Sequence, residues 1–281
     1  MARPPRPTVS APTPEPLPFG LLTVAAEQFR VDDKARHGVE WDQAAGVTGG
    51  VLPIGESGRW TGELVPENYD DVEGAEGQLP VVTTSPFLIY AGVKAKPVGL
   101  PGEEPIAALE ARAKAKLQLT AGRWIERGFQ PQLTAAAVHP DITGTTPVDP
   151  DIAIGLLEEW IGDTIGAHGV IHTPRRGFTA ISKHCVEKGA RQQTKLATRV
   201  AVGTGYANLA PGGGAAAAGT VWIWATGPVV VNRSGIEALG SGAAAMTLAQ
   251  NTATVYSTEV VSVGYEVGAV AVPVKFEVEN P

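Results

Sequence analysis

The stretch that decides the fold is EEPIAALEARAKAKLQLTAGRWIERGF, residues 103–129, which carries the longest helical pattern in the chain. Two acids precede Pro105, and this marks a helix start, because proline suits the first helical position and carboxylates suit the positive end of the helix dipole. Gly128 followed by Pro131 is expected to end the helix. A single helix over about residues 103–129 is therefore predicted, which is long for a chain of 281 residues.

This helix is predicted to have two distinct faces. Apolar residues recur at spacings of seven, four and seven and would form the buried face: Ile106, Ala113, Leu117 and Trp124. Basic residues lie about 100° away around the helix and form a stripe: Arg112, Lys116, Arg123 and Arg127. The ordinary explanation of the stripe is a solvated flank, and contact with an acidic partner is the alternative.

The composition excludes several classes of protein. Hydrophobic residues make up 43% of the chain and its mean hydropathy is +0.02, so it can form a sizeable core. The net charge of −7 disfavours a dedicated nucleic-acid binder. The single cysteine, Cys185, excludes an internal disulfide and a cysteine-rich zinc site. The 34 glycines and 23 prolines suit a β-rich protein with many turns.

Two segments near the N-terminus have little apolar material of their own. Residues 1–19 contain seven prolines and are expected to form an extended arm, with a disordered tail as the alternative for the first ten residues. Residues 48–80 are rich in glycine, and their short apolar pieces could pair as a hairpin. Their only base is Arg59, against seven acids: Glu56, Glu63, Glu67, Asp70, Asp71, Glu73 and Glu76. A loop of this length without a core normally has a function or a partner.

Strands and shorter helices are predicted on both sides of the long helix. Residues 81–98 are predicted to be strands, and both faces of 87–92 are apolar, which indicates a strand buried on both sides. Asp149-Pro150 begins a second helix, which Gly166 or Gly169 would end. Its apolar face would consist of Ile152, Leu156, Trp160 and Ile161.

The rest of the chain alternates between a short helical segment and valine-rich strands. GVIHTP, residues 169–174, is predicted to be a strand, and Pro174 opens a helix that carries Phe178, Ile181 and Cys185. Strands then follow to the C-terminus. Residues 226–228, Thr-Gly-Pro, are predicted to be a tight turn between two of these strands.

A search for catalytic and metal-binding motifs gives no active site. His168 and His172 are separated by Gly169 and a predicted strand, so they do not form a helical metal-ligand pair. His184 and Cys185 are adjacent on a predicted helix and would point apart, which does not suit a nucleophile and its base. We therefore predict no catalytic residue, no cofactor and no metal ligand.

Several stretches resemble the major capsid proteins of tailed bacteriophages, whose fold is shared with encapsulin shells. PFLIYAGVKAK leads into the long helix that ends in WIERGF, as a strand leads into the spine helix of that family. IAIGLLEEWIGDTIGAHGVIHTP resembles the opening of the family's axial domain. TKLATRVAVGTGY, TVWIWATGPVVVN and NTATVYSTEVVSVGYEVGAVAV resemble its closing strands.

The resemblance implies an α+β fold with an N-terminal arm, an extended β-hairpin loop, a long spine helix with a peripheral sheet, and a mixed α/β axial domain. On this basis we assign five segments. They are an arm (1–47), an extended loop (48–80), a peripheral domain with the spine helix (81–147), an axial domain (148–250) and C-terminal strands that close the sheet (251–281).

The resemblance also implies a function and a set of partners. The chain would be a major capsid protein without catalysis or cofactor, assembled in the host cytoplasm and present in the virion. Many copies would form hexamers and pentamers around double-stranded DNA, with separate scaffolding, portal and decoration proteins as further partners. A minor head or decoration protein and an encapsulin-type shell are the alternatives. A small α/β enzyme with a site near His168, His172 and Tyr206 is a remote one.

The charged features suggest where subunits would meet. The acidic loop would repel itself and would seek the basic stripe of another subunit. The candidate contact residues are therefore the four bases of the stripe and the seven acids of the loop. Contact of the stripe with packaged DNA is the rival explanation.

Overall fold

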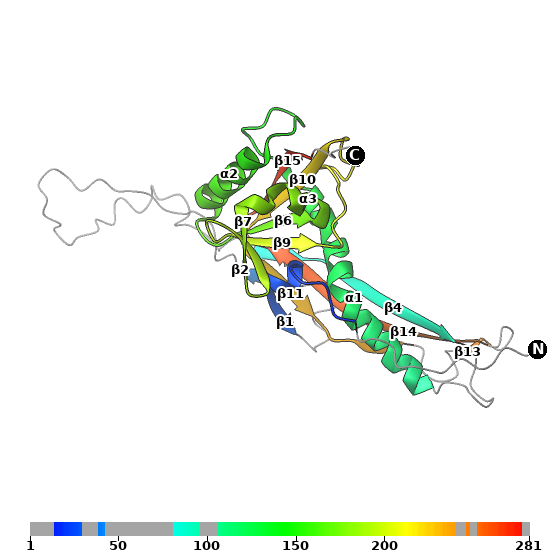
Figure 1. Cartoon of the computed structure of the whole chain (residues 1–281). Coiled ribbons are helices and arrows are strands. Elements are labelled where there is room, and N and C mark those ends of the chain that lie inside the picture. The colour runs from blue at the N-terminus through cyan, green and yellow to red at the C-terminus, as the bar shows by residue number, and fades with distance from the viewer. Residues whose placement is uncertain are drawn as a thin grey trace, which may run out of the picture.

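The computed structural model describes residues 14–29, 39–42, 81–95, 106–239, 246–247 and 252–276. It consists of a body and an elongated extension (Figure 1). One long helix, α1 (Ile106–Thr134), runs from the end of the extension into the body. The predicted loop at 48–80 and most of the arm lie outside the described residues, so the five-segment division stays a prediction.

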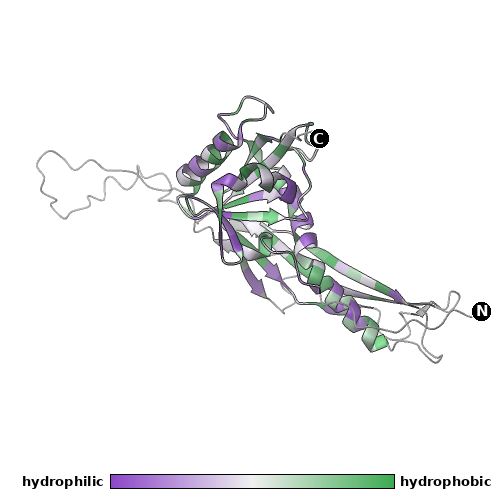
Figure 2. Ribbon diagram, in the orientation of Figure 1, coloured by the Kyte–Doolittle hydropathy of each residue, from purple (hydrophilic) through white to green (hydrophobic). Residues whose placement is uncertain are grey.

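The body is built on a seven-stranded sheet with the order β5-β15-β10-β6-β9-β8-β7. Its central strands are almost wholly buried and hydrophobic, whereas the β7 edge is hydrophilic (Figure 2). The seven strands of this sheet are β5 (Ala137–Val138), β6 (Val170–Pro174), β7 (Cys185–Lys188), β8 (Arg191–Thr194), β9 (Arg199–Gly203), β10 (Thr220–Thr226) and β15 (Ala269–Lys275).

Strand β14 (Thr252–Tyr265) organises a second, six-stranded sheet, which reaches into the extension. It pairs along ten residues with β4 (Pro86–Ala95) on one side and with β11 (Val229–Arg233), β12 (Glu237–Leu239) and β13 (Met246–Thr247) on the other. Strand β1 (Ala26–Phe29) joins β11 in parallel. Strands β2 (Val39–Asp42) and β3 (Val81–Thr84) form a separate pair.

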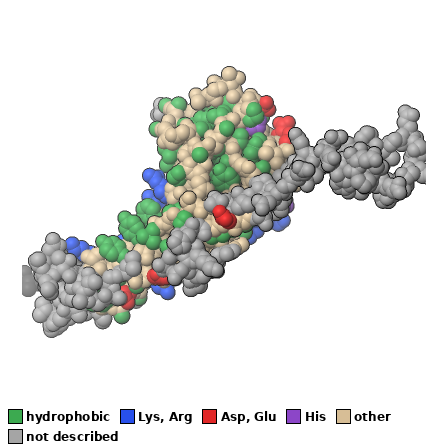
Figure 3. Space-filling view, turned by 180° about the vertical axis from the view of Figure 1, so that it is seen from behind, with side chains coloured by type: hydrophobic (Ala, Val, Ile, Leu, Met, Phe, Trp, Pro, Cys, Tyr) green, Lys and Arg blue, Asp and Glu red, His purple; other side chains and the backbone are tan. Residues whose placement is uncertain are grey.

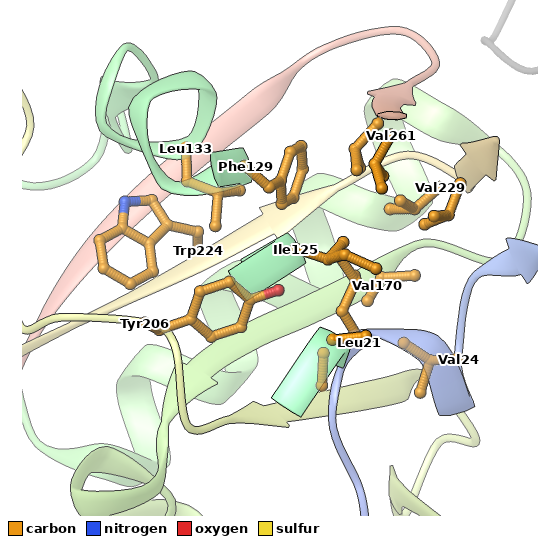
Figure 4. Close-up of a cluster of buried hydrophobic side chains, with 14 of the residues drawn as sticks. Leu21, Val24, Ile125, Phe129, Leu133, Val170, Tyr206, Trp224, Val229 and Val261 are labelled. Atoms are coloured by element: carbon orange, nitrogen blue, oxygen red, sulfur yellow. The ribbon is translucent and has the colours of Figure 1, made fainter. Parts of the chain in front are cut away.

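The core has two main parts, one on each face of the seven-stranded sheet. On one face, the C-terminal half of α1 packs between the two sheets, with Ile125, Phe129 and Leu133 fully buried (Figure 4). On the other face lie α2 (Pro150–Trp160), the π-helical turn Ile161–Ile165 and α3 (Arg175–Ile181), which ends in the 3-10 turn Ser182–His184. A further 3-10 turn, Leu21–Thr23, precedes β1.

The helix α1 differs from its prediction in its end and in its buried face. It continues through Gly128 and Pro131 to Thr134. Gly128 lies here because β4 packs so closely that a Cβ atom would meet the Phe87 ring. The buried side chains follow steps of four residues, Leu109, Ala113, Leu117, Ala121, Ile125, Phe129 and Leu133. Trp124 therefore lies off this line and is 41% exposed.

Two glycines of α1 give a matched test of this packing. Gly122→Ala is expected to stabilise the protein by about 0.5–1 kcal/mol, because alanine suits a helix better than glycine. The nearest atom to the new Cβ would be Leu22 Cδ1 at 3.9 Å. Gly128→Ala is expected to destabilise it by about 1–3 kcal/mol, because the Phe87 ring must move. Urea unfolding measures the free energy of unfolding of both variants. Changes of the same sign and size would show that Gly128 is not packed against Phe87 as described.

Other sequence predictions are correct about where a helix starts but wrong about which of its residues are buried. Helix α2 starts at Pro150 and ends at Gly166 beyond the π turn, as predicted. Its buried residues are Ala153, Ile154 and Leu157, whereas Ile152 is 52% exposed, so the predicted apolar face is wrong at Ile152. It is correct at Ile161, which is buried, and at Trp160, which packs against the same core. Residue Cys185 opens β7 and does not belong to a helix.

Two strand predictions are also corrected. Strand β4 is buried on one face only, because Leu88 and Tyr90 are 56% and 61% exposed. Residues 226–228 do connect two strands, β10 and β11, but these lie in different sheets and form no hairpin. The chain crosses between the sheets here, beside the equivalent crossing from β14 to β15, where Glu266 N–H donates to Pro228 O (3.1 Å).

No helix within the described part of the chain is long and apolar enough to cross a membrane.

Candidate assembly surface

The predicted basic stripe lies on the exposed side of α1. Two of its members contact neighbours in the extension. Lys116 Nζ donates to Gly92 O in β4 (3.2 Å), and the Arg123 guanidinium lies over the Trp124 ring, 5.4 Å from its centroid. Arg112 and Arg127 are exposed on the same helix. The structure thus groups the four bases on one element, as predicted, while the seven predicted loop acids lie outside the described residues.

A groove of about 340 Å³ lies beside this stripe, between β4 and α1. Strand β4 lines it with residues 87–90, and α1 lines it with Trp124, Arg127 and Gly128. Among the described strands β4 pairs only with β14, so the groove follows an edge of the sheet. Arg127 lies in its wall, so the groove combines apolar surface with positive charge.

The groove continues into an exposed apolar surface on the sheet. Leu88, Tyr90 and Tyr256 are all more than two-fifths exposed, and Tyr90 meets Tyr256 edge to face with centroids 6.3 Å apart. Figure 3 shows hydrophobic side chains gathered along the extension, with Lys and Arg side chains beside them. A contiguous apolar patch on a soluble protein commonly marks a site of protein contact. Its only sequence signal is the run of apolar residues on both faces of 87–92, and that pattern by itself predicts burial.

The N-terminal segment is fixed to α1 by a buried carboxylate. Glu126 is 1% exposed and accepts hydrogen bonds from Leu21 N–H (3.0 Å) and Gly205 N–H (2.7 Å). Burial raises the pKa of Glu126 above its ordinary value, although backbone donors and Arg175 act in the opposite direction. Leu21 itself fills the core beside Ile125 (Figure 4). The segment is therefore part of the folded body.

A cluster of ion pairs around Arg233 holds β1 against the six-stranded sheet. The Arg233 guanidinium donates to both oxygens of Glu259 (2.9 and 2.8 Å) and also to Glu27 Oε1 (2.6 Å). Glu259 is buried, whereas Glu27 lies at the rim. Three strands, β1, β11 and β14, thus meet at one arginine.

Two of the three residues of the alternative enzyme site, His172 and Tyr206, contact each other in the core. His172 Nδ1 lies 3.0 Å from Tyr206 Oη and its Nε2 lies 2.9 Å from Thr226 Oγ1. His172 is fully buried and Tyr206 is 5% exposed. Burial lowers the pKa of His172 to about 3 and raises that of Tyr206 well above its ordinary value. Both are therefore neutral near pH 7, and their contacts join β6, β10 and the segment after β9. His168 is exposed and apart from this network.

His184 and Cys185 point to different neighbours, as predicted. His184 Nε2 contacts Asp151 Oδ1 (2.8 Å), whereas Cys185 packs against the core under α2 and α3. Burial raises the pKa of the Cys185 thiol to about 11, which disfavours a thiolate nucleophile. Within the described residues, no three His, Cys, Asp or Glu side chains come together as a metal site.

Comparison with known proteins identifies the fold. No protein-family model matches the chain, and no curated protein matches it in sequence. In structure it resembles the capsid of a native GTA particle with a TM-score of 0.53 and 12% identity, over 98% of this chain and 94% of that one. The capsid of cyanophage P-SCSP1u gives a TM-score of 0.48 at 8% identity, over 99% and 93% of the two chains. A structure of Mycobacterium phage Adephagia gives 0.48 at 10%, over 97% and 93%.

The chain has the α+β fold of the GTA-particle capsid, which confirms the capsid fold class predicted from sequence; the predicted extended loop lies outside the described residues.

Proposed function

We propose that this protein is the major capsid protein of a tailed bacteriophage and has a structural, non-catalytic role. The observation that carries the proposal is the structural similarity to the GTA-particle capsid, which covers 98% of this chain. The exposed apolar and basic surface on the extension supports it, because a monomer gains nothing from such a surface. Copies would tile an icosahedral head as hexamers and pentamers through head-to-tail contacts.

The remaining partners follow from this role. The shell would enclose double-stranded DNA through non-specific contacts, and separate scaffolding, portal and decoration proteins would act with it. Assembly would take place in the host cytoplasm and the product would be the virion. The function needs no cofactor.

Electron microscopy of the purified full-length protein tests the proposal. Closed shells, or rings of five and six subunits, are the expected result. A protein that remains monomeric at high concentration, with or without co-expressed scaffolding protein, would contradict it. The number of copies per particle separates a major from a minor head protein, and cargo enclosed in place of DNA would indicate an encapsulin-type compartment.

The contact proposed between subunits joins the acidic loop at 48–80 of one copy to the basic stripe of the next. Charge complementarity supports it, since seven acids would face four bases. The groove beside the stripe would receive short apolar pieces of the loop, such as residues 51–54, VLPI. Each exposed ion pair contributes only about 0.2–1 kcal/mol, but the pairs repeat at every interface.

Charge reversal on α1 tests this contact. Arg123→Glu with Arg127→Glu is expected to reduce the yield of empty shells to background, because the acidic loop would then meet acidic residues. Asp70→Lys with Asp71→Lys in the same chain should restore part of the yield.

The matched control is Lys114→Glu, an exposed lysine of α1 outside the stripe, which should leave assembly unchanged. Thermal unfolding of all variants should match the wild type. Normal empty shells from the Arg123/Arg127 variant would rule out the contact between loop and stripe. Normal shells that lose DNA would show that the stripe lies on the inner surface of the shell and contacts DNA.

A further inference from the structure

A second cluster of cations lies at the opposite part of the molecule, on the hairpin that ends the seven-stranded sheet. Strands β7 and β8 are joined by Gly189 and Ala190, with Gly189 at φ +62°, and Lys188 and Arg191 are the closing cross-strand pair. Arg199 of β9 is the partner of Gln193 in β8. Side chains alternate between the faces of a sheet, so Lys188, Arg191, Gln193 and Arg199 share one face.

This face is hollowed into a pocket of about 500 Å³. Lys188, Arg191 and Arg199 line it together with His168 from the loop before β6. No carboxylate of the described residues contributes to its lining. The cations come from three neighbouring strands, which lie about 5 Å apart, so they form a row across the sheet edge.

The cations of this pocket are uncompensated within the described part of the chain. Lys188 and Arg191 make no ion pair there, and Arg199 donates to one backbone carbonyl, Val24 O (2.9 Å). Two other lysines of the body are paired, Lys183 with Asp151 (2.6 Å) and Lys275 with Asp149 (3.1 Å). Like charges placed directly opposite in a hairpin are destabilising. The protein has a net charge of −7, yet three cations line this pocket without a carboxylate of the described residues among them, which points to an anion from outside the subunit.

We propose that this pocket binds phosphate groups of a nucleic-acid backbone. Guanidinium groups match phosphate oxygens in a bidentate geometry, and a row of cations suits a polyanion with regularly repeated charges better than it suits an isolated carboxylate. Recognition would not depend on base sequence, because contacts of this kind reach only the backbone. The inference rests on the proposed function, in which the shell encloses DNA, and it assigns this contact to the β7–β8 hairpin in place of the α1 stripe.

The test is the binding of a short DNA duplex of random sequence to the purified full-length protein, followed by fluorescence anisotropy at several salt concentrations. Lys188→Gln with Arg191→Gln is expected to weaken binding by about tenfold or more. It should also reduce the slope of the logarithm of the binding constant against the logarithm of the salt concentration by about two. The reason is that each of the two cations would neutralise one phosphate. The control variant, Lys183→Gln with Lys275→Gln, removes the same charge from paired positions and should bind within about twofold of the wild type.

The unfolding temperature of the Lys188/Arg191 variant gives a second measurement. If the two cations only stabilised the fold, their removal would lower this temperature. The Lys188/Arg191 variant should unfold at the same temperature as the wild type or higher, because it removes a repulsion. Shells formed by this variant would show that assembly, and with it the proposed function, is intact although the shell no longer holds DNA at this site.

Three results would overturn the proposal. They are equal DNA binding by variant and wild type, stabilisation of the wild type by inorganic phosphate without DNA binding, and loss of shells with DNA binding unchanged. The second would indicate a site for a free anion, and the third would indicate contact with an acidic segment of another copy.

Discussion

Replacing Glu126 with alanine is expected to lower the free energy of unfolding by about 3 kcal/mol or more. The change removes the acceptors of Leu21 N–H and Gly205 N–H. Each donor would remain buried without a partner, at a cost of about 1–3 kcal/mol per group. Urea unfolding of the purified protein measures the effect. The control is Glu110→Ala, a partly exposed acid of the same helix, which should change stability by less than about 0.5 kcal/mol.

The same site predicts a pH dependence. Because the pKa of Glu126 is raised above its ordinary value of 4.5, the folded protein binds this proton more tightly than the unfolded chain does. Stability from this group is therefore greatest at low pH and falls as the pH rises from 4.5 through the raised pKa. The advantage of the wild type over Glu126→Gln should grow as the pH is lowered from 7 to 5. A constant difference over this range would show that the carboxyl does not titrate as expected.

Replacing Arg233 with methionine is expected to cost about 3–5 kcal/mol, because it leaves the Glu259 carboxylate buried without its cation. The double variant Arg233→Met with Glu259→Leu should recover most of this loss, since it removes the buried charge as well. Both are compared with the wild type by urea unfolding.

Glu27→Ala is the matched control on the exposed side of the same arginine. Its ion pair with Arg233 is short, 2.6 Å, but Glu27 lies at the rim, so its removal should cost less than about 1 kcal/mol. If the double variant were as unstable as the single one, the cost of Arg233→Met would come from poorer packing and not from the unpaired charge.

The sequence predicted where helices and strands occur better than it predicted what packs against them. Asp149-Pro150 marked a helix start correctly, because start signals depend on local backbone chemistry, whereas Pro105 lies outside the described residues. The end of α1 was wrong because Gly128 and Pro131 act as stop signals only where no tertiary packing favours the helix. Here Ile125, Phe129 and Leu133 hold the last turns between two sheets.

Burial was the least predictable property. Hydrophobicity alone places Trp124, Leu88 and Tyr90 in the core, and all three are exposed on the extension. Apolar residues on a monomer's surface look like core residues in sequence, since an assembly interface is chemically similar to an interior. The basic stripe was predictable because helical periodicity alone groups its residues, whereas the β7–β8 cluster depends on a strand register that spacing does not reveal.

The parallel pairing of β1 with β11 has a consequence for the order of synthesis. Ala26 pairs with Val230, so the N-terminal strand cannot find its neighbour until about two hundred more residues have been translated. At about 5–20 residues per second, that delay is on the order of 10–40 s on the ribosome. During this interval Leu21 and Val24, which are buried in the finished protein, have no core to enter. A nascent chain in this state is expected to be bound by chaperones that recognise apolar segments, and protease protection of its N-terminal residues should appear only after release of the full-length chain.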